Sequence, residues 1–77
     1  MSQQIQKDYY SIIGEIWKTF RKYIGTVSEV TSTTDPRWKT ICDDFDRIEA
    51  DAPERMKRYA GEMVLLHVDE LERRWRH

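Results

Sequence analysis

Apolar residues recur at spacings of three and four along most of this chain, and that periodicity restricts it to helices. Over residues 2–24, projected at about 100° per residue, the apolar side chains fall within an arc of roughly 160°. An arc that wide predicts a first helix covered by more than one neighbour. The residues in it are Ile5, Tyr9, Tyr10, Ile12, Ile13, Ile16, Trp17, Phe20, Tyr23 and Ile24.

Two junctions divide the rest of the chain. Asp35 followed by Pro36 is typical of a helix start, with the aspartate as N-cap and the proline at the first helical position. Asp51 is expected to cap a third helix, because Glu54 follows three residues later as in a capping box. Apolar residues then follow at helical spacing, with Leu65 alone on the polar side of the third helix.

The stretch from Gly25 to Thr34 is rich in Thr, Ser and Val, which are poor helix formers. Val27 and Val30 nevertheless continue the apolar stripe, so the first helix is expected to overrun Gly25. We predict a single all-α domain over 1–77, a small antiparallel three-helix bundle with helices at about 3–30, 36–50 and 52–76. A chain of 77 residues buries only about 60% of its unfolded surface, so dimerisation could complete the core.

Charge and cysteine content exclude several function classes. The 13 basic and 14 acidic residues nearly cancel, which gives no overall attraction to nucleic acid or to an anionic membrane. No apolar run approaches the ~20 residues of a membrane span, and we expect no secretory signal, because the first residues lack a basic start and an apolar core. Cys42 is the only cysteine, which is typical of a reduced, cytoplasmic protein without disulfides.

Candidate catalytic groups are few. The acidic residues of the second and third helices loosely resemble the paired motifs of all-α nucleotide pyrophosphohydrolases, but the glutamate-rich motif is missing, and a solvated acidic face is favoured. His67 has one same-face carboxylate, Glu70, and Cys42 lies on an apolar face without a base. We expect no enzyme activity, no cofactor and no catalytic or metal-binding residue. The acidic residues are Asp43, Asp44, Asp46, Glu49, Asp69, Glu70 and Glu72.

The C-terminal turn supports an alternative function in nucleic-acid binding. Trp75 could stack on a base while Arg73, Arg74 and Arg76 hold phosphates. The competing interpretation is a basic last turn that complements the helix dipole. Glu70 and Glu72 dilute the positive charge, so nucleic acid is the second choice of partner.

Aromatic residues are numerous for so short a chain, nine in 77, and three are tryptophan. Tryptophan and tyrosine are enriched at interface centres, although they could equally fill a small core. Tyr10, Gly14, Trp17 and Arg21 form one ridge on the first helix, and glycine inside a helix costs roughly 1 kcal/mol relative to alanine. The ridge predicts an interface, with a homodimer expected. Alternatively, Gly14 makes room for a side chain of the same molecule.

Residues 7–18 and 69–73 resemble small uncharacterised helical proteins carried on prophages and conjugative elements of Firmicutes. The matching runs are KDYYSIIGEIWK and DELER. The resemblance implies an accessory, non-enzymatic protein that binds and blocks a host or defence protein, as anti-CRISPR proteins do. The leading hypothesis is therefore a protein–protein interaction module encoded by a mobile element.

Overall fold

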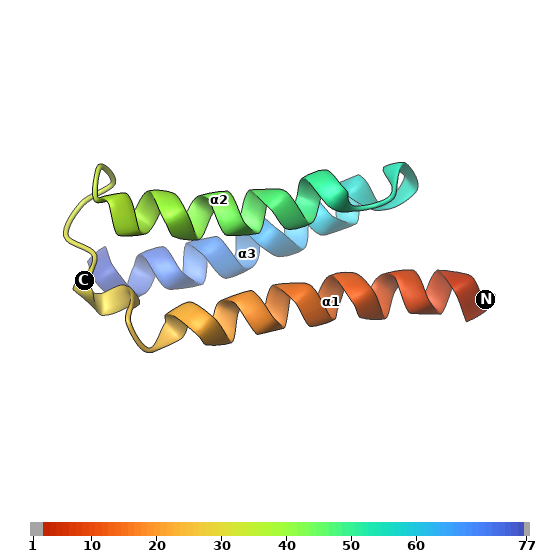
Figure 1. Cartoon of the computed structure of the whole chain (residues 1–77), viewed down its shortest axis with the longest axis horizontal. Helices are drawn as coiled ribbons and strands as arrows, with labels where there is room; N and C mark the ends of the chain where they lie inside the picture. The colour runs from red at the N-terminus through yellow and green to blue at the C-terminus, as the bar shows by residue number, and fades with distance from the viewer. Residues whose placement is uncertain (1–2, 77) are drawn as a thin grey trace.

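Three long helices form the computed structural model, which describes residues 3–76: α1 (Gln3–Ile24), α2 (Pro36–Asp51) and α3 (Lys57–Arg76). α2 runs back along α1, and α3 returns parallel to α1, so the helices alternate in direction (Figure 1). No strand occurs within 3–76, which confirms the predicted all-α three-helix bundle. None of the helices described is long and apolar enough to cross a membrane.

The start of α2 follows the predicted cap. One carboxylate oxygen of Asp35 accepts a hydrogen bond from the Arg37 backbone N–H at 2.9 Å, and the other accepts from the Thr31 N–H at 3.0 Å. The Arg37 side chain also donates to both oxygens, and these bonds hold the pKa of Asp35 well below its usual range. Asp35 thereby fixes the last turn of the linker to the first turn of α2.

α1 is shorter than predicted. It ends at Ile24 and is followed by a separate 3₁₀ turn, η1 (Val27–Glu29), so the expected extension to residue 30 is wrong. Val27 and Val30 are nevertheless 1% and 4% exposed, because the linker crosses the end of the bundle and packs against α3. The two valines are therefore apolar because a loop is buried there.

The second junction also differs from the expectation. Asp51 is the last residue of α2 and not the cap of α3, which begins at Lys57 after a 3₁₀ turn, η2 (Glu54–Met56). Pro53 explains the break, because a residue before proline is disfavoured in the helical region, and Ala52 is extended with ψ of 147°. The buried Ala52 and Met56 then hold this connection against the core.

The core lies along the axis between the helices. Its largest fully buried side chains are Phe45 of α2, Ile16 of α1, Leu71 of α3 and Val27 of the linker. α1 meets α3 through two edge-to-face ring pairs, Tyr9 with Tyr59 at 4.9 Å and Phe20 with His67 at 5.3 Å between centroids. These two pairs define the α1–α3 seam that carries the site described next.

Candidate interaction surface

A strip of exposed apolar side chains follows the outer side of the α1–α3 seam. Tyr10, Ile13 and Trp17 of α1 are 73%, 43% and 53% exposed, and Leu66 of α3 is 63% exposed. Ile13 and Trp17 lie one turn from the seam residues Tyr9 and Phe20, and Leu66 directly precedes His67 in the sequence. We call Tyr10, Ile13, Trp17 and Leu66 the seam patch.

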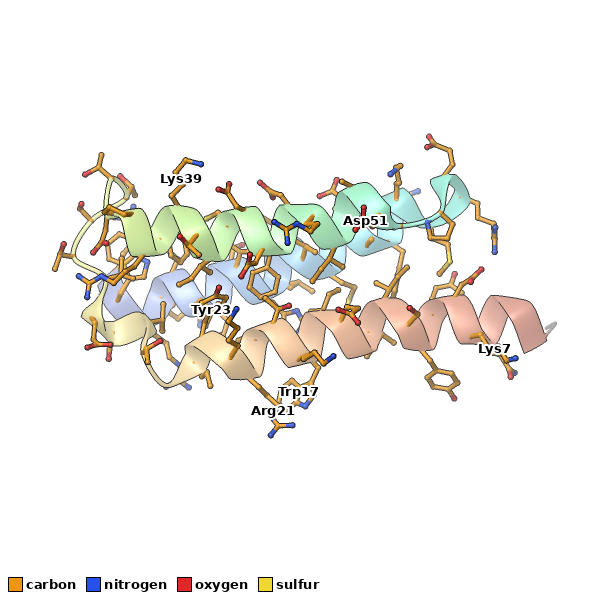
Figure 2. All side chains as sticks on the ribbon, viewed as in Figure 1. Lys7, Trp17, Arg21, Tyr23, Lys39 and Asp51 are labelled. Carbon is orange, nitrogen blue, oxygen red and sulfur yellow. The ribbon has the colours of Figure 1, made fainter. Side chains whose placement is uncertain are left out.

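Contacts within the bundle orient Trp17. Its ring stacks on Phe20, with centroids 5.8 Å apart and planes 21° apart, and Phe20 packs edge-on against His67. Trp17 and Arg21 leave α1 on the side away from α2 (Figure 2). The indole is therefore held in one orientation while half of its surface stays open. A side chain ordered in this way loses little conformational entropy when a partner covers it.

Gly14 lies beside the seam patch, and its surroundings are empty. A methyl group added at Gly14 would meet no atom within 4 Å, so the idea that this glycine makes room for a side chain of the same molecule is wrong. By contrast, a methyl group at Gly61 would lie 3.1 Å from the Glu49 carboxylate. The four predicted ridge residues are thus all exposed on α1.

Two members of the seam patch, Ile13 and Leu66, are not among the interface residues predicted from the sequence. Sequence periodicity assigns Ile13 and Leu66 to core-facing arcs, and both face solvent instead. Leu66 lies at the edge of its arc, whereas Ile13 lies near the middle of the arc of α1, and the structure leaves both side chains uncovered. The width of the apolar arcs could have predicted some exposed apolar side chains, since three helices cannot cover so broad an apolar surface on each other. Leu65 is 59% exposed, as its polar-side position predicts, but it borders α2 and lies outside the patch.

The residues of the nucleic-acid alternative are not gathered into one open surface. Trp75 is half-buried and packs edge-to-face on Trp38, with centroids 5.6 Å apart. The Arg76 guanidinium lies 4.7 Å from the centre of the Trp75 ring and donates to Glu72 at 2.8 Å. These neighbours occupy the surface of Trp75 on which a nucleobase would stack. Arg73 and Arg74 remain exposed.

The other candidate groups have structural contacts. The His67 Nδ1–H donates to the Met63 carbonyl at 2.8 Å, within the same helix. Burial raises the pKa of the Cys42 thiol, and the nearby carboxylates raise it further. The thiol therefore stays protonated, which is its less nucleophilic form. Asp43 pairs with Lys39 at 2.8 Å. In the part of the chain that the structure describes, no three His, Cys, Asp or Glu side chains gather as a metal site would require.

A polar groove of about 440 Å³ lies on the other side of α1, between α1 and α2. Several of its charged groups have partners within the molecule. Asp44 accepts from the Tyr23 hydroxyl and lies 3.7 Å from the Lys22 ammonium, and Asp8 pairs with Arg55. The groove is therefore a polar packing surface that links α1 to the rest of the bundle.

Comparison with protein families, with curated proteins and with solved structures finds no match to this chain.

Proposed function

We propose that this protein is a non-enzymatic protein–protein interaction module that binds its partner through the seam patch. One observation carries the proposal: three of the five exposed large apolar side chains among the described residues lie on α1, and a fourth, Leu66, directly precedes His67, which contacts Phe20 of α1. Scattered apolar side chains are ordinary on protein surfaces, whereas a gathered strip marks a binding surface. Tyrosine and tryptophan are also the residues that most often dominate binding energy.

Gly14 supports the same conclusion. In the middle of a helix it lowers stability relative to alanine, and within residues 3–76 no neighbouring side chain uses the space that it leaves. A small residue between Tyr10 and Trp17 leaves a shallow gap into which a partner helix could fit closely. The geometry therefore favours a helical partner surface over a flat one.

The sequence resemblance predicts that binding blocks a host or defence protein. On this hypothesis the bundle is an inhibitor: the seam patch covers a functional surface of the partner, and the protein catalyses no reaction. That role, like the mobile-element origin and the cytoplasmic location, stays a prediction.

Differential capture from the native cell tests the proposal. The wild-type protein and its Trp17→Ala and Leu66→Ala variants would each be used as bait, and the bound proteins identified by mass spectrometry. A true partner is retained by the wild type and lost by both variants. Leu65→Ala is the matched control, because Leu65 is equally exposed but lies outside the patch. Partners retained equally by all four baits would contradict the proposal.

A further inference from the structure

We infer, on the basis of the proposed function, that the seam patch binds an apolar helix flanked by acidic side chains and not a second copy of this chain. The inference rests on the charges that border the patch on α1. Lys7, Lys18 and Arg21 are all exposed, and none has an ion-pair partner within the described residues.

The three cations share one face of α1. Lys7, Gly14 and Arg21 follow at intervals of seven residues, which is two helical turns, and Lys18 lies one turn after Gly14. They form a positive border along the side of the patch that faces away from α3. The acidic residues of the same helix lie elsewhere, since Asp8 and Glu15 line the groove toward α2.

Most other cations of the bundle are already paired. Lys22 lies near Asp44, Lys39 and Arg58 each pair with a carboxylate four residues on, and Arg55 pairs with Asp8. Arg47, Lys57, Arg73 and Arg74 are in no ion pair among the described residues either, so what sets Lys7, Lys18 and Arg21 apart is their place beside the exposed apolar side chains of α1. A partner with carboxylates beside its own apolar stripe would complement both parts of this surface.

A second copy of this chain fits the surface poorly. An antiparallel two-fold pairing of α1 centred on Gly14 brings Lys7 against Arg21 of the other copy, and a parallel pairing brings each cation against its equivalent. An isologous interface repeats the same patch on both sides, so neither pairing of α1 with α1 brings an acidic group of that helix to the cations. Like charges in contact disfavour a homodimer paired through α1, and in any other pairing the acidic groups would have to come from α3, where Glu62 and Glu70 lie one turn on either side of Leu66.

Aromatic and cationic residues together could also suit a nucleic acid or an anionic membrane. Ile13 and Leu66 favour a protein partner over a nucleic acid, because aliphatic side chains offer a nucleobase no stacking surface. The open space at Gly14 favours a helix over a lipid surface, because only a shaped partner can fill it. The two other classes are distinguished as outcomes of the test.

A display library of helical peptides provides the test, with leucine fixed along one face and the flanking positions randomised. Selection on the wild-type protein, with removal of peptides that also bind Tyr10→Ala/Trp17→Ala, should enrich Asp and Glu at the flanks. Selection on Lys7→Glu/Lys18→Glu/Arg21→Glu should enrich Lys and Arg instead. An acidic peptide chosen on the wild type should lose affinity for the charge-reversed variant by about tenfold, and the loss should shrink with added salt.

Each failure points to a different error. Neutral or basic flanks enriched on the wild type would overturn the acidic partner and leave the proposed function standing. No enrichment over the double alanine variant would overturn both. A patch-dependent dimer in sedimentation velocity would overturn the exclusion of self-pairing. Patch-dependent binding to phosphatidylserine vesicles or to a DNA oligonucleotide, stronger than to any selected peptide, would assign the surface to a lipid or a nucleic acid. Circular dichroism would verify that each variant stays helical.

Discussion

The two sides of α1 differ in which of their side chains have partners within the molecule. Toward α2, polar side chains meet each other: Tyr23 lies between α1 and α2 (Figure 2) and donates to Asp44, and Asp8 pairs with Arg55. On the outer side of the α3 seam, apolar side chains face solvent, and the cations beside them form no ion pair within residues 3–76. One side of the helix thus pairs several of its polar groups within the molecule, whereas the other leaves both apolar surface and charge exposed to solvent.

This difference separates residues that hold the fold from residues available for binding. Helix amphipathicity alone would place the polar side of α1 outward and the apolar side inward. The bundle departs from this pattern at both borders of the apolar arc. The departures on the α2 side are explained by internal pairs, and those on the seam side are what the proposed partner would cover.

The largest expected effect tests the boundary between the two sides. Ile16 is 1% exposed and lies next to Trp17, which is 53% exposed. Ile16→Ala should lower the free energy of unfolding by about 2–5 kcal/mol, because a buried side chain is replaced by a cavity. Urea denaturation followed by circular dichroism measures it. An Ile16→Ala variant as stable as the wild type would show that α1 is not held to the bundle as described.

Trp17→Ala should show the reverse behaviour. Binding to a captured partner or a selected peptide should weaken by about 2 kcal/mol or more. The free energy of unfolding should fall by only about 1 kcal/mol, because the substitution removes a single ring stack, the one on Phe20. Calorimetric titration measures the change in binding free energy, and denaturation of the same preparation measures the change in the free energy of unfolding. A decrease in stability as large as that of Ile16→Ala would place Trp17 in the core.

Gly14→Ala should stabilise the bundle by about 0.5–1 kcal/mol, because the added methyl group meets no atom and the helix gains rigidity. Gly61→Ala is the matched control. There the new methyl group would lie 3.1 Å from the Glu49 carboxylate, which has to shift, so the gain should be smaller. Thermal unfolding ranks the two variants. Equal gains would mean that the space around Gly14 is not distinctive.

The smallest effect concerns alkaline pH on the groove side. Burial raises the pKa of Tyr23, helped by its hydrogen bond to Asp44, so the neutral phenol is favoured in the folded state. Its contribution is complete below the unfolded pKa of about 10 and is lost as pH rises through the folded pKa. Stability should therefore fall slightly less steeply above pH 10 in Tyr23→Phe than in the wild type. Identical slopes would contradict the assigned pKa shift.

Sequence reasoning recovers the fold better than the junctions. The three helices and the Asp35 cap follow from local signals, namely apolar spacing and a side chain that bonds its own backbone. The ends of α1 and the start of α3 do not. Val27 and Val30 mimic a helical stripe while packing from a loop, and Asp51 has the sequence of a cap while remaining helical. At the valines tertiary burial overrides a correct local rule, whereas at Asp51 one local signal, the proline at 53, overrides another.

The candidate site follows from the sequence only in part, for a similar reason. The spacing of Tyr10, Gly14, Trp17 and Arg21 defines a ridge from one helix alone, so it could be predicted from the sequence. Leu66 joins the ridge only because α3 lies parallel to α1, with the Phe20–His67 contact setting the register. No pattern within α3 indicates this. Whether a cation of α1 finds an ion-pair partner likewise depends on where the carboxylates of other elements lie.

The different environments of the tryptophans give the protein two separate optical reporters. Trp38 and Trp75 contact each other where α2 begins and α3 ends, so their emission should change when the bundle opens. Trp17 is half in water, and its emission should shift to shorter wavelength when a partner covers it. A Trp17-only variant would follow binding without an attached dye, and a variant lacking only Trp17 would follow unfolding.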